Sequence, residues 1–334
     1  NDKVGNGHTL KSISVSAGLT TINTDTITTS GTQTYTGAVT LAQTATLTNT
    51  SSAITFSSTV DSTALAANSL TFGAGTGTAT FTGAVGGASN GALGTITNAS
   101  GQTLIFSDAV SATTIANYGT LLFNATAAKT ISPAITDNGT TAVQVINSAN
   151  SVAPGVITFS GNVAADTITI GNTTYAGSAL FNGTVSGTNI NIVGGDHASE
   201  ASLGKFANTV SVTAITLDTN TGTATAEFSG SSKTVTGTID GLATPEGIVT
   251  ASGTTTHCIV PIHSPLGIPC EARITIKMAP WTTVARNTVA IGNHGTFPNW
   301  LTSPAPERKA TSTSARVAVP GGATAAAALP IAAA

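Results

Sequence analysis

The pattern of apolar and polar positions along the chain alternates with a period of two over short stretches. Residues 167–170 (TITI), 189–192 (NINI) and 214–217 (AITL) each place an apolar residue at every second position. Such alternation is typical of a strand with one buried face, and turn-forming Gly and Asn residues follow each stretch. No helical period is sustained across residues 1–241, where frequent Thr, Val and Gly disfavour helix. The pattern therefore predicts an all-β protein.

An aromatic residue recurs through this region inside the same short motif. Seven of eight copies keep a Val four residues after the ring, as in YTGAV at 35–39 and FSGNV at 159–163. The successive intervals are 21, 25, 25, 53, 22, 25 and 22 residues, and the long interval contains a degenerate copy at Phe123. The ring positions are Tyr35, Phe56, Phe81, Phe106, Phe123, Phe159, Phe181, Phe206 and Phe228.

Each unit of about 22–25 residues reads as strand, turn, strand, corner and strand. One unit cannot bury its apolar face alone, so we expect successive units to stack ring over ring and Val over Val in a β-solenoid. With about 4.8 Å between hydrogen-bonded strands, nine or ten coils would give a rod of roughly 45 Å. A set of β-sandwich domains is the alternative, but sandwiches do not require the same ring at the same place in every unit.

The motif copies also carry a family resemblance. The segments ATFTGAV, ITFSGNV and ALFNGTV, set among TLTN and TITN, resemble passenger repeats of bacterial autotransporters and filamentous-haemagglutinin-type exoproteins, with rickettsial surface antigens closest. The resemblance covers residues 12–241. It implies a right-handed parallel β-helix at the bacterial cell surface, used in adhesion, autoaggregation or a surface coat. The chain shows no translocator barrel and no secretion domain, so the resemblance implies a fragment or a released passenger.

Residues 242–334 differ in composition from the preceding 241 residues. They hold 10 of the 12 prolines, all four arginines, both tryptophans and both cysteines. Proline opposes a continuing strand ladder because it has no backbone N–H to donate. We therefore expect two regions, a repetitive solenoid at 1–241 and a separate segment at 242–334. That segment is either a cap or docking module, or a linker or unrelated stretch.

Composition narrows the function classes. Charged residues make up 7% of the chain and its formal net charge is −3, which argues against a nucleic-acid surface because such a surface needs clustered cations. No run approaches the roughly 18 apolar residues of a membrane-spanning helix. The chain starts without Met, and its Thr- and Gly-rich repeat region lacks cysteine, as in many exported surface proteins. We expect no cofactor.

The tail contains the residues that most resemble a metal site. His257, Cys258, His263 and Cys270 fall within 14 residues, and zinc favours such ligands. Their spacing matches no common zinc motif, so we predict no metal. A disulfide between Cys258 and Cys270 is favoured in an exported protein, with free thiols as the alternative.

Catalytic candidates are sparse in the repeat region. Asp196 and Glu200 form its one close acidic pair, in a turn-rich insertion that begins at Gly194 and resembles half of a calcium-binding nonapeptide. Such calcium sites need tandem copies, so a plain turn is favoured. Clustered carboxylates of the kind that cleave sugars are missing, and we predict no enzyme.

Three functions remain in competition. The leading one is an extracellular structural or adhesive protein, which self-associates or binds a ligand on a host or neighbouring cell. The second is an ice- or carbohydrate-binding solenoid, suggested by the Thr-x-Thr run at 44–50. An ice surface needs a regular Thr row, which irregular coil lengths would be expected to break. The third, a carbohydrate-active enzyme, lacks its carboxylates.

Overall fold

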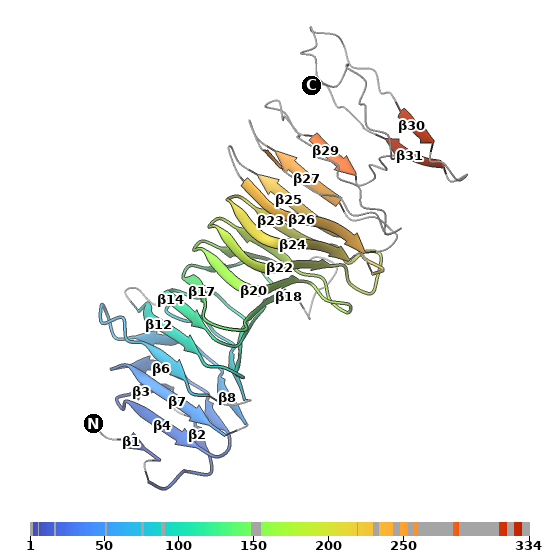
Figure 1. Cartoon of the computed structure of the whole chain (residues 1–334). Helices are drawn as coiled ribbons and strands as arrows, with labels where there is room; N and C mark the ends of the chain where they lie inside the picture. The colour runs from blue at the N-terminus through green and yellow to red at the C-terminus, as the bar shows by residue number, and fades with distance from the viewer. Residues whose placement is uncertain are drawn as a thin grey trace.

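The chain folds into a rod of stacked parallel strands. The computed structural model describes residues 3–258, with short breaks at 6, 17, 51, 75–76, 88–90, 148–154, 219, 230–233, 243–247 and 253–256, and three further strands beyond them. The described residues form strands and turns without helix, stacked in about 10 turns of a right-handed parallel β-helix. Figure 1 shows the strands side by side along the long axis, with the N-terminus at one end.

Each coil has three faces, named here A, B and C in chain order. In the first seven coils face A consists of β1 (Lys3–Val4), β4 (Thr26–Thr29), β7 (Ala45–Asn49), β10 (Leu70–Phe72), β12 (Leu93–Asn98), β14 (Ala112–Asn117) and β17 (Ala134–Asp137). Face B consists of β2 (Ile13–Val15), β5 (Gln33–Tyr35), β8 (Ala53–Phe56), β11 (Thr78–Phe81), β13 (Thr103–Phe106), β15 (Thr120–Asn124) and β18 (Ala142–Ile146).

Face C is shorter at first and lengthens later. Between its third and fourth strands it is reduced to single bridges, from Val60 to Val85, Val110 and then Ile131. Its strands are β3 (Leu19–Ile22), β6 (Ala38–Leu41), β9 (Val60–Ser62), β16 (Lys129–Ile131), β19 (Val156–Phe159), β21 (Ser178–Phe181), β23 (Ser202–Phe206), β25 (Ala224–Ser229) and β27 (Ile248–Ser252).

Faces A and B merge in the second half of the rod. The first part of β20 pairs with β17 of face A, and its last part pairs with β18 of face B, so one strand spans both faces. The following coils repeat this arrangement. The merged strands are β20 (Val163–Ile170), β22 (Val185–Val193), β24 (Val210–Asp218) and β26 (Thr234–Leu242).

The parallel ladder continues past the expected boundary at residue 241. The strand β27 pairs in parallel with β25, and β28 (His257–Cys258) pairs in parallel with β26. The remaining described strands are antiparallel: β29 (Thr283–Arg286) on β27, and β30 (Ser314–Ala318) with β31 (Thr324–Ala328). The described parallel ladder therefore includes Leu242, Ile248–Ser252 and His257–Cys258 of the compositionally distinct segment.

The interior is a set of apolar columns, because a strand alternates its side chains and parallel register repeats that alternation in every coil. One column on face B runs Ile54, Ala79, Leu104, Leu121, Val143, Ile168, Ile190 and Ile215, each buried. This continuity explains how irregular coil lengths still give one core: the strands hold the register while the connecting corners take up the extra residues.

Candidate functional site

The nine aromatic residues of the sequence motif all lie inside the rod, in two columns. On face B the rings stack from Tyr35 to Phe123, with centroids 4.9–5.5 Å apart and planes within 18° of parallel. On face C they stack from Phe159 to Phe228, with centroids 4.9–5.3 Å apart and planes within 22°. Stacked contacts of this kind add about 0.5–1.5 kcal/mol each beyond the area that they bury.

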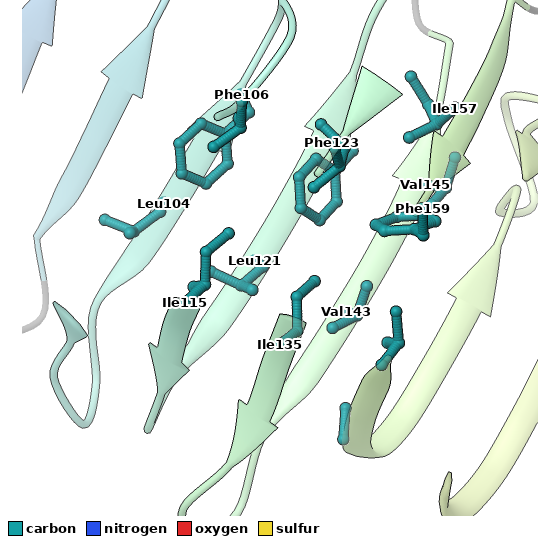
Figure 2. Packing of buried hydrophobic residues seen from close by; sticks show 14 of the residues in the cluster. Leu104, Phe106, Ile115, Leu121, Phe123, Ile135, Val143, Val145, Ile157 and Phe159 are labelled. Carbon is teal, nitrogen blue, oxygen red and sulfur yellow. The ribbon is translucent and has the colours of Figure 1, made fainter. Parts of the chain in front are cut away.

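The two columns meet at a junction between Phe123 and Phe159. These rings contact edge to face, with centroids 5.1 Å apart and an interplanar angle of 88°. Above Phe123 the face B column continues with Val145 and Ile170, while Phe159 lies on Ile131 of face C. Figure 2 shows Phe106 and Phe123 on successive strands, with Phe159 beside Val145 in the next coil. The sequence led us to expect one column, whereas the structure has two.

Two columns arise because the motif lies at one corner of the coil before the junction and at a different corner after it. Before the junction, the ring ends a face B strand and its Val starts face C, as with Phe81 and Val85. After the junction, the ring ends a face C strand and its Val starts face A, as with Phe181 and Val185. Residues 131–135 (ISPAI) form the first copy of the motif at the new corner. Ile131 occupies the ring position and Ile135 the Val position, so the sequence pattern does not identify this copy.

Backbone contact between successive corners explains the small third residue of the motif. A Cβ placed on Gly183 would come within 2.3 Å of the Gly161 carbonyl oxygen in the coil below. Inside the second half of the rod, a Cβ on Gly204 would come within 2.8 Å of the Ile192 side chain. The column beside the face C rings is correspondingly small, with Ala179, Gly204 and Ala226 in register. Small residues here provide room for the rings.

Buried amides line the corner between faces A and B in the first half, and the aromatic motif gave no sign of them. Asn98 Nδ2 donates to Asn117 Oδ1 at 2.9 Å and to the Thr120 carbonyl at 3.0 Å. Gln33 Nε2 donates to the Thr48 carbonyl at 3.0 Å. Each amide gives a backbone carbonyl at this corner a side-chain donor, so these amide donors and carbonyls are paired with one another. The Asn that ends TLTN and TITN was the available sequence signal.

Faces A and B present neutral side chains to solvent. The outward row of face A runs Thr26, Thr46, Thr71, Thr97, Ala116, Thr136, Ala164, Ser186 and Ser211. The equivalent row of face B runs Thr34, Thr55, Thr80, Ile105, Leu122, Gln144, Thr169, Asn191 and Thr216. No charged residue lies within these two stretches, although Lys3 of β1 is the register partner of Thr26 and Asp240 of β26 is that of Thr216. The side chains of these two rows can offer hydroxyl and amide hydrogen bonds and methyl contacts.

The two lysine–carboxylate ion pairs of the described residues lie on face C and its corner with face B. Lys205 and Glu227 are register neighbours on β23 and β25 and form an ion pair of 2.7 Å. Lys129 Nζ lies 2.6 Å from Asp108 Oδ1. Burial acts to raise the pKa of the Asp108 carboxyl, but the hydrogen bond from Lys129, a second one from the Ala109 amide and the lysine charge together lower it. Asp108 is therefore ionised at neutral pH and serves as a structural partner.

The insertion at residues 194–200 forms a compact turn on the corner between faces B and C. The Gly195 amide donates to the Glu200 carbonyl, and the Glu200 amide donates to the His197 carbonyl. Asn220 of the next coil caps the insertion through a bond from its Nδ2 to the Gly195 carbonyl at 3.3 Å. Asp196 lies 3.6 Å from His197, at the exposed tip. The geometry is that of a hydrogen-bonded turn.

The predicted cysteine pair lies outside what the structure describes in side-chain detail. The backbone of Cys258 belongs to β28, whereas Cys270 and His263 fall outside the described residues. Within the described part of the chain, no group of three or more His, Cys, Asp or Glu residues could hold a metal ion. No helix among the described residues is long and apolar enough to cross a membrane.

Comparisons with protein-family models, curated proteins and solved structures found no match for this chain. The fold and its surfaces therefore carry the functional argument alone.

Proposed function

We propose that this chain is an extracellular structural or adhesive protein of the bacterial cell surface, which associates with copies of itself. The supporting observation is the unbroken parallel ladder of about 10 turns, with its rings inside and neutral hydroxyls on two of its faces. Such a rod spans distance with few specialised residues, which suits a coat, a fibre or a displayed adhesin. The resemblance of its repeats to the passenger repeats of bacterial autotransporters also supports this use.

The N-terminal coil is the surface proposed for self-association. Among the described residues, β1, β2 and β3 each pair with one other strand. Leu19 is 63% exposed and Leu10 is 40% exposed on this coil. An open strand edge with exposed apolar side chains favours pairing with another β edge. A second copy of the chain supplies such an edge.

Lysine opposes this association and makes it sensitive to salt. Lys3 and Lys11 lie exposed on the same coil, and charged residues on an edge strand discourage edge pairing. Two N-terminal coils that approach each other therefore repel at low ionic strength. At about 0.15 M salt the screening length falls to about 8 Å, so association should strengthen as salt is added.

Negative-stain electron microscopy with sedimentation velocity tests the proposal. We expect single short rods at low salt and pairs of rods joined at their N-terminal ends as salt and protein concentration rise. The variant Leu19→Lys should reduce the associated fraction. Leu65→Lys is the matched control, because Leu65 is 82% exposed but lies away from the first coil. Compact particles, or association that Leu19→Lys leaves unchanged, would contradict the proposal.

A further inference from the structure

Face A carries a row of hydroxyl side chains that the irregular coil lengths do not interrupt. Strand register places Thr26, Thr46, Thr71 and Thr97 side by side in four successive coils. The corresponding intervals along the chain are 20, 25 and 26 residues. The extra residues lie in corners and loops, so neighbouring hydroxyls keep the strand spacing of about 4.8 Å. The sequence argument against a regular row therefore does not hold for this face.

A second hydroxyl row lies beside the first, two residues earlier on each strand. Thr95 and Thr114 are register partners in it, and Thr44 and Ser69 precede them. Thr44 Oγ1 accepts a hydrogen bond from the Ser69 amide at 3.1 Å, and Ser69 Oγ accepts one from the Thr95 amide at 2.9 Å. These bonds hold hydroxyls in fixed positions. The two rows form a grid of about 4.8 Å across strands and about 6.6 Å along them.

The chemistry of the grid restricts what it can bind. Threonine has few χ1 states, so its methyl and hydroxyl groups are ordered before any contact is made. No charged residue interrupts the first row between Thr26 and Ser211, so a charged polymer gains nothing there. The rings of the two columns, Tyr35 to Phe228, are buried in the core, and the exposed ring of Tyr118 follows the end of β14 and belongs to neither row of the grid. What fits is an extended neutral lattice of hydrogen-bonding groups.

We propose that the first half of face A, from Thr26 to Thr114, is an ice-binding surface. Ordered water is a lattice of neutral donors and acceptors, and bridging waters bind hydroxyls nearly as well as direct partners do. The methyl groups between the hydroxyls limit competing liquid-like hydration. Figure 1 shows the strands of this face, β4, β7, β12 and β14, following one another along the rod. The inference does not depend on the proposed structural role.

Ice partition of the full chain tests the proposal. The protein is placed in slowly growing ice and its concentration is compared between ice and remaining liquid, alongside inhibition of ice recrystallisation. We expect the wild type to enter ice and Thr71→Lys to lower the ice-bound fraction several-fold. Thr71→Val, which removes only the hydroxyl, should give a smaller loss. Circular dichroism and the melting temperature confirm that each variant is folded.

Thr40→Lys is the matched control, because Thr40 points outward on face C at a similar exposure. It should partition into ice as the wild type does. Exclusion of the wild type from ice, or an equal loss with Thr40→Lys, would overturn the proposal. So would binding to insoluble cellulose or chitin without ice binding, or a dimer that Thr71→Lys dissociates. Rods seen by microscopy without ice binding would leave the structural role standing and reject this one.

Discussion

At the scale of single residues, the ring of Phe159 at the junction is buried and also contacts both aromatic columns. Phe159 stacks on Phe181 in its own column and contacts Phe123 of the other column edge to face. It is fully buried, and Ile131 lies beneath it. Phe159 and Phe123 are therefore the pair of rings through which the two columns make contact.

Replacing this ring tests the junction. Phe159→Ala should lower the free energy of unfolding by about 3–5 kcal/mol, because it removes a large buried side chain and leaves a cavity. Urea denaturation followed by circular dichroism measures the change. Tyr118→Ala is a suitable control: Tyr118 is 41% exposed, so its loss should stay within about 0.5 kcal/mol. Equal effects from both changes would exclude a stabilising aromatic core.

The first ring of the face B column gives a pH-dependent prediction. Burial raises the pKa of Tyr35 to about 12, from about 10 in the unfolded chain. The folded state therefore retains a proton that the unfolded state loses, so the contribution of Tyr35 to stability is unchanged below about pH 10 and is lost as the pH rises from about 10 to 12. Tyr35→Phe should remove this component of the alkaline loss. Identical melting curves for both proteins across this range would contradict it.

Crowding at the corner gives a prediction of a different kind. Gly183→Ala should destabilise the fold by about 1–3 kcal/mol, since the added Cβ meets the Gly161 backbone and the corner must shift. Asn208→Ala, at the equivalent position of the next coil, should have a smaller effect. Thermal unfolding of the two variants compares them, and a neutral Gly183→Ala would show that the corner relaxes freely.

At the scale of elements, the corner amides decide how faces A and B join. Asn98 is fully buried and donates to groups in the next coil, so its side chain connects two corners. In the second half of the rod this corner disappears, because β20, β22 and β24 run straight through it. The amides are therefore specific to the half in which the strands break.

Removing one amide should expose this role. Asn98→Leu removes the buried hydrogen bonds to the Asn117 side chain and the Thr120 carbonyl, at a cost of about 1–3 kcal/mol. Asn138→Leu changes an exposed amide that bonds only to Thr136, and should have little effect. Chemical denaturation of both variants provides the measurement. A larger loss from Asn138→Leu would show that corner burial is unimportant.

The ring-to-ring spacing was sufficient to predict parallel stacking, but not the junction. The motif looks the same at either corner, since a ring, a small residue and a Val fit both. Only the interval of 53 residues between Phe106 and Phe159 signalled a change, and it reads equally well as two ordinary coils. In the structure this interval runs from the end of a face B strand, through two full coils, to the end of a face C strand. The hydroxyl row was also hidden, because register depends on where corners absorb residues.

At the scale of the whole molecule, each coil contacts mainly its neighbours, so stability is close to a sum over coils and interfaces. The ladder of faces A and B crosses the junction without a break, through β17, β18 and β20. At the junction each stack ends on an aliphatic residue, Val145 above Phe123 and Ile131 beneath Phe159, so the two stacks meet through a single edge-to-face pair. The junction is therefore where the rod should first divide.

This division gives a prediction about cooperativity. The wild type should unfold in a single urea transition. Phe159→Ala should broaden or split that transition, because the interface free energy that couples the two halves of the rod then falls below the free energy of unfolding of either half. Phe206→Ala, inside the second stack, should shift the midpoint without splitting the transition. Hydrogen exchange measured by mass spectrometry would show which half opens first. A single sharp transition in Phe159→Ala would show that the strand ladder alone couples the halves.

The change of corner also decides where the chain can vary. In the first half of the rod the aromatic motif forms a tight corner between faces B and C. Long connections, such as residues 63–69, form the corner between faces C and A. In the second half the positions are exchanged, and connections such as residues 194–201 leave the corner between B and C. Loops tolerate sequence change that strands do not. The rod therefore carries two separate rows of loops, one at the corner between faces C and A and one at the corner between faces B and C. Mutation can alter each row without affecting the other.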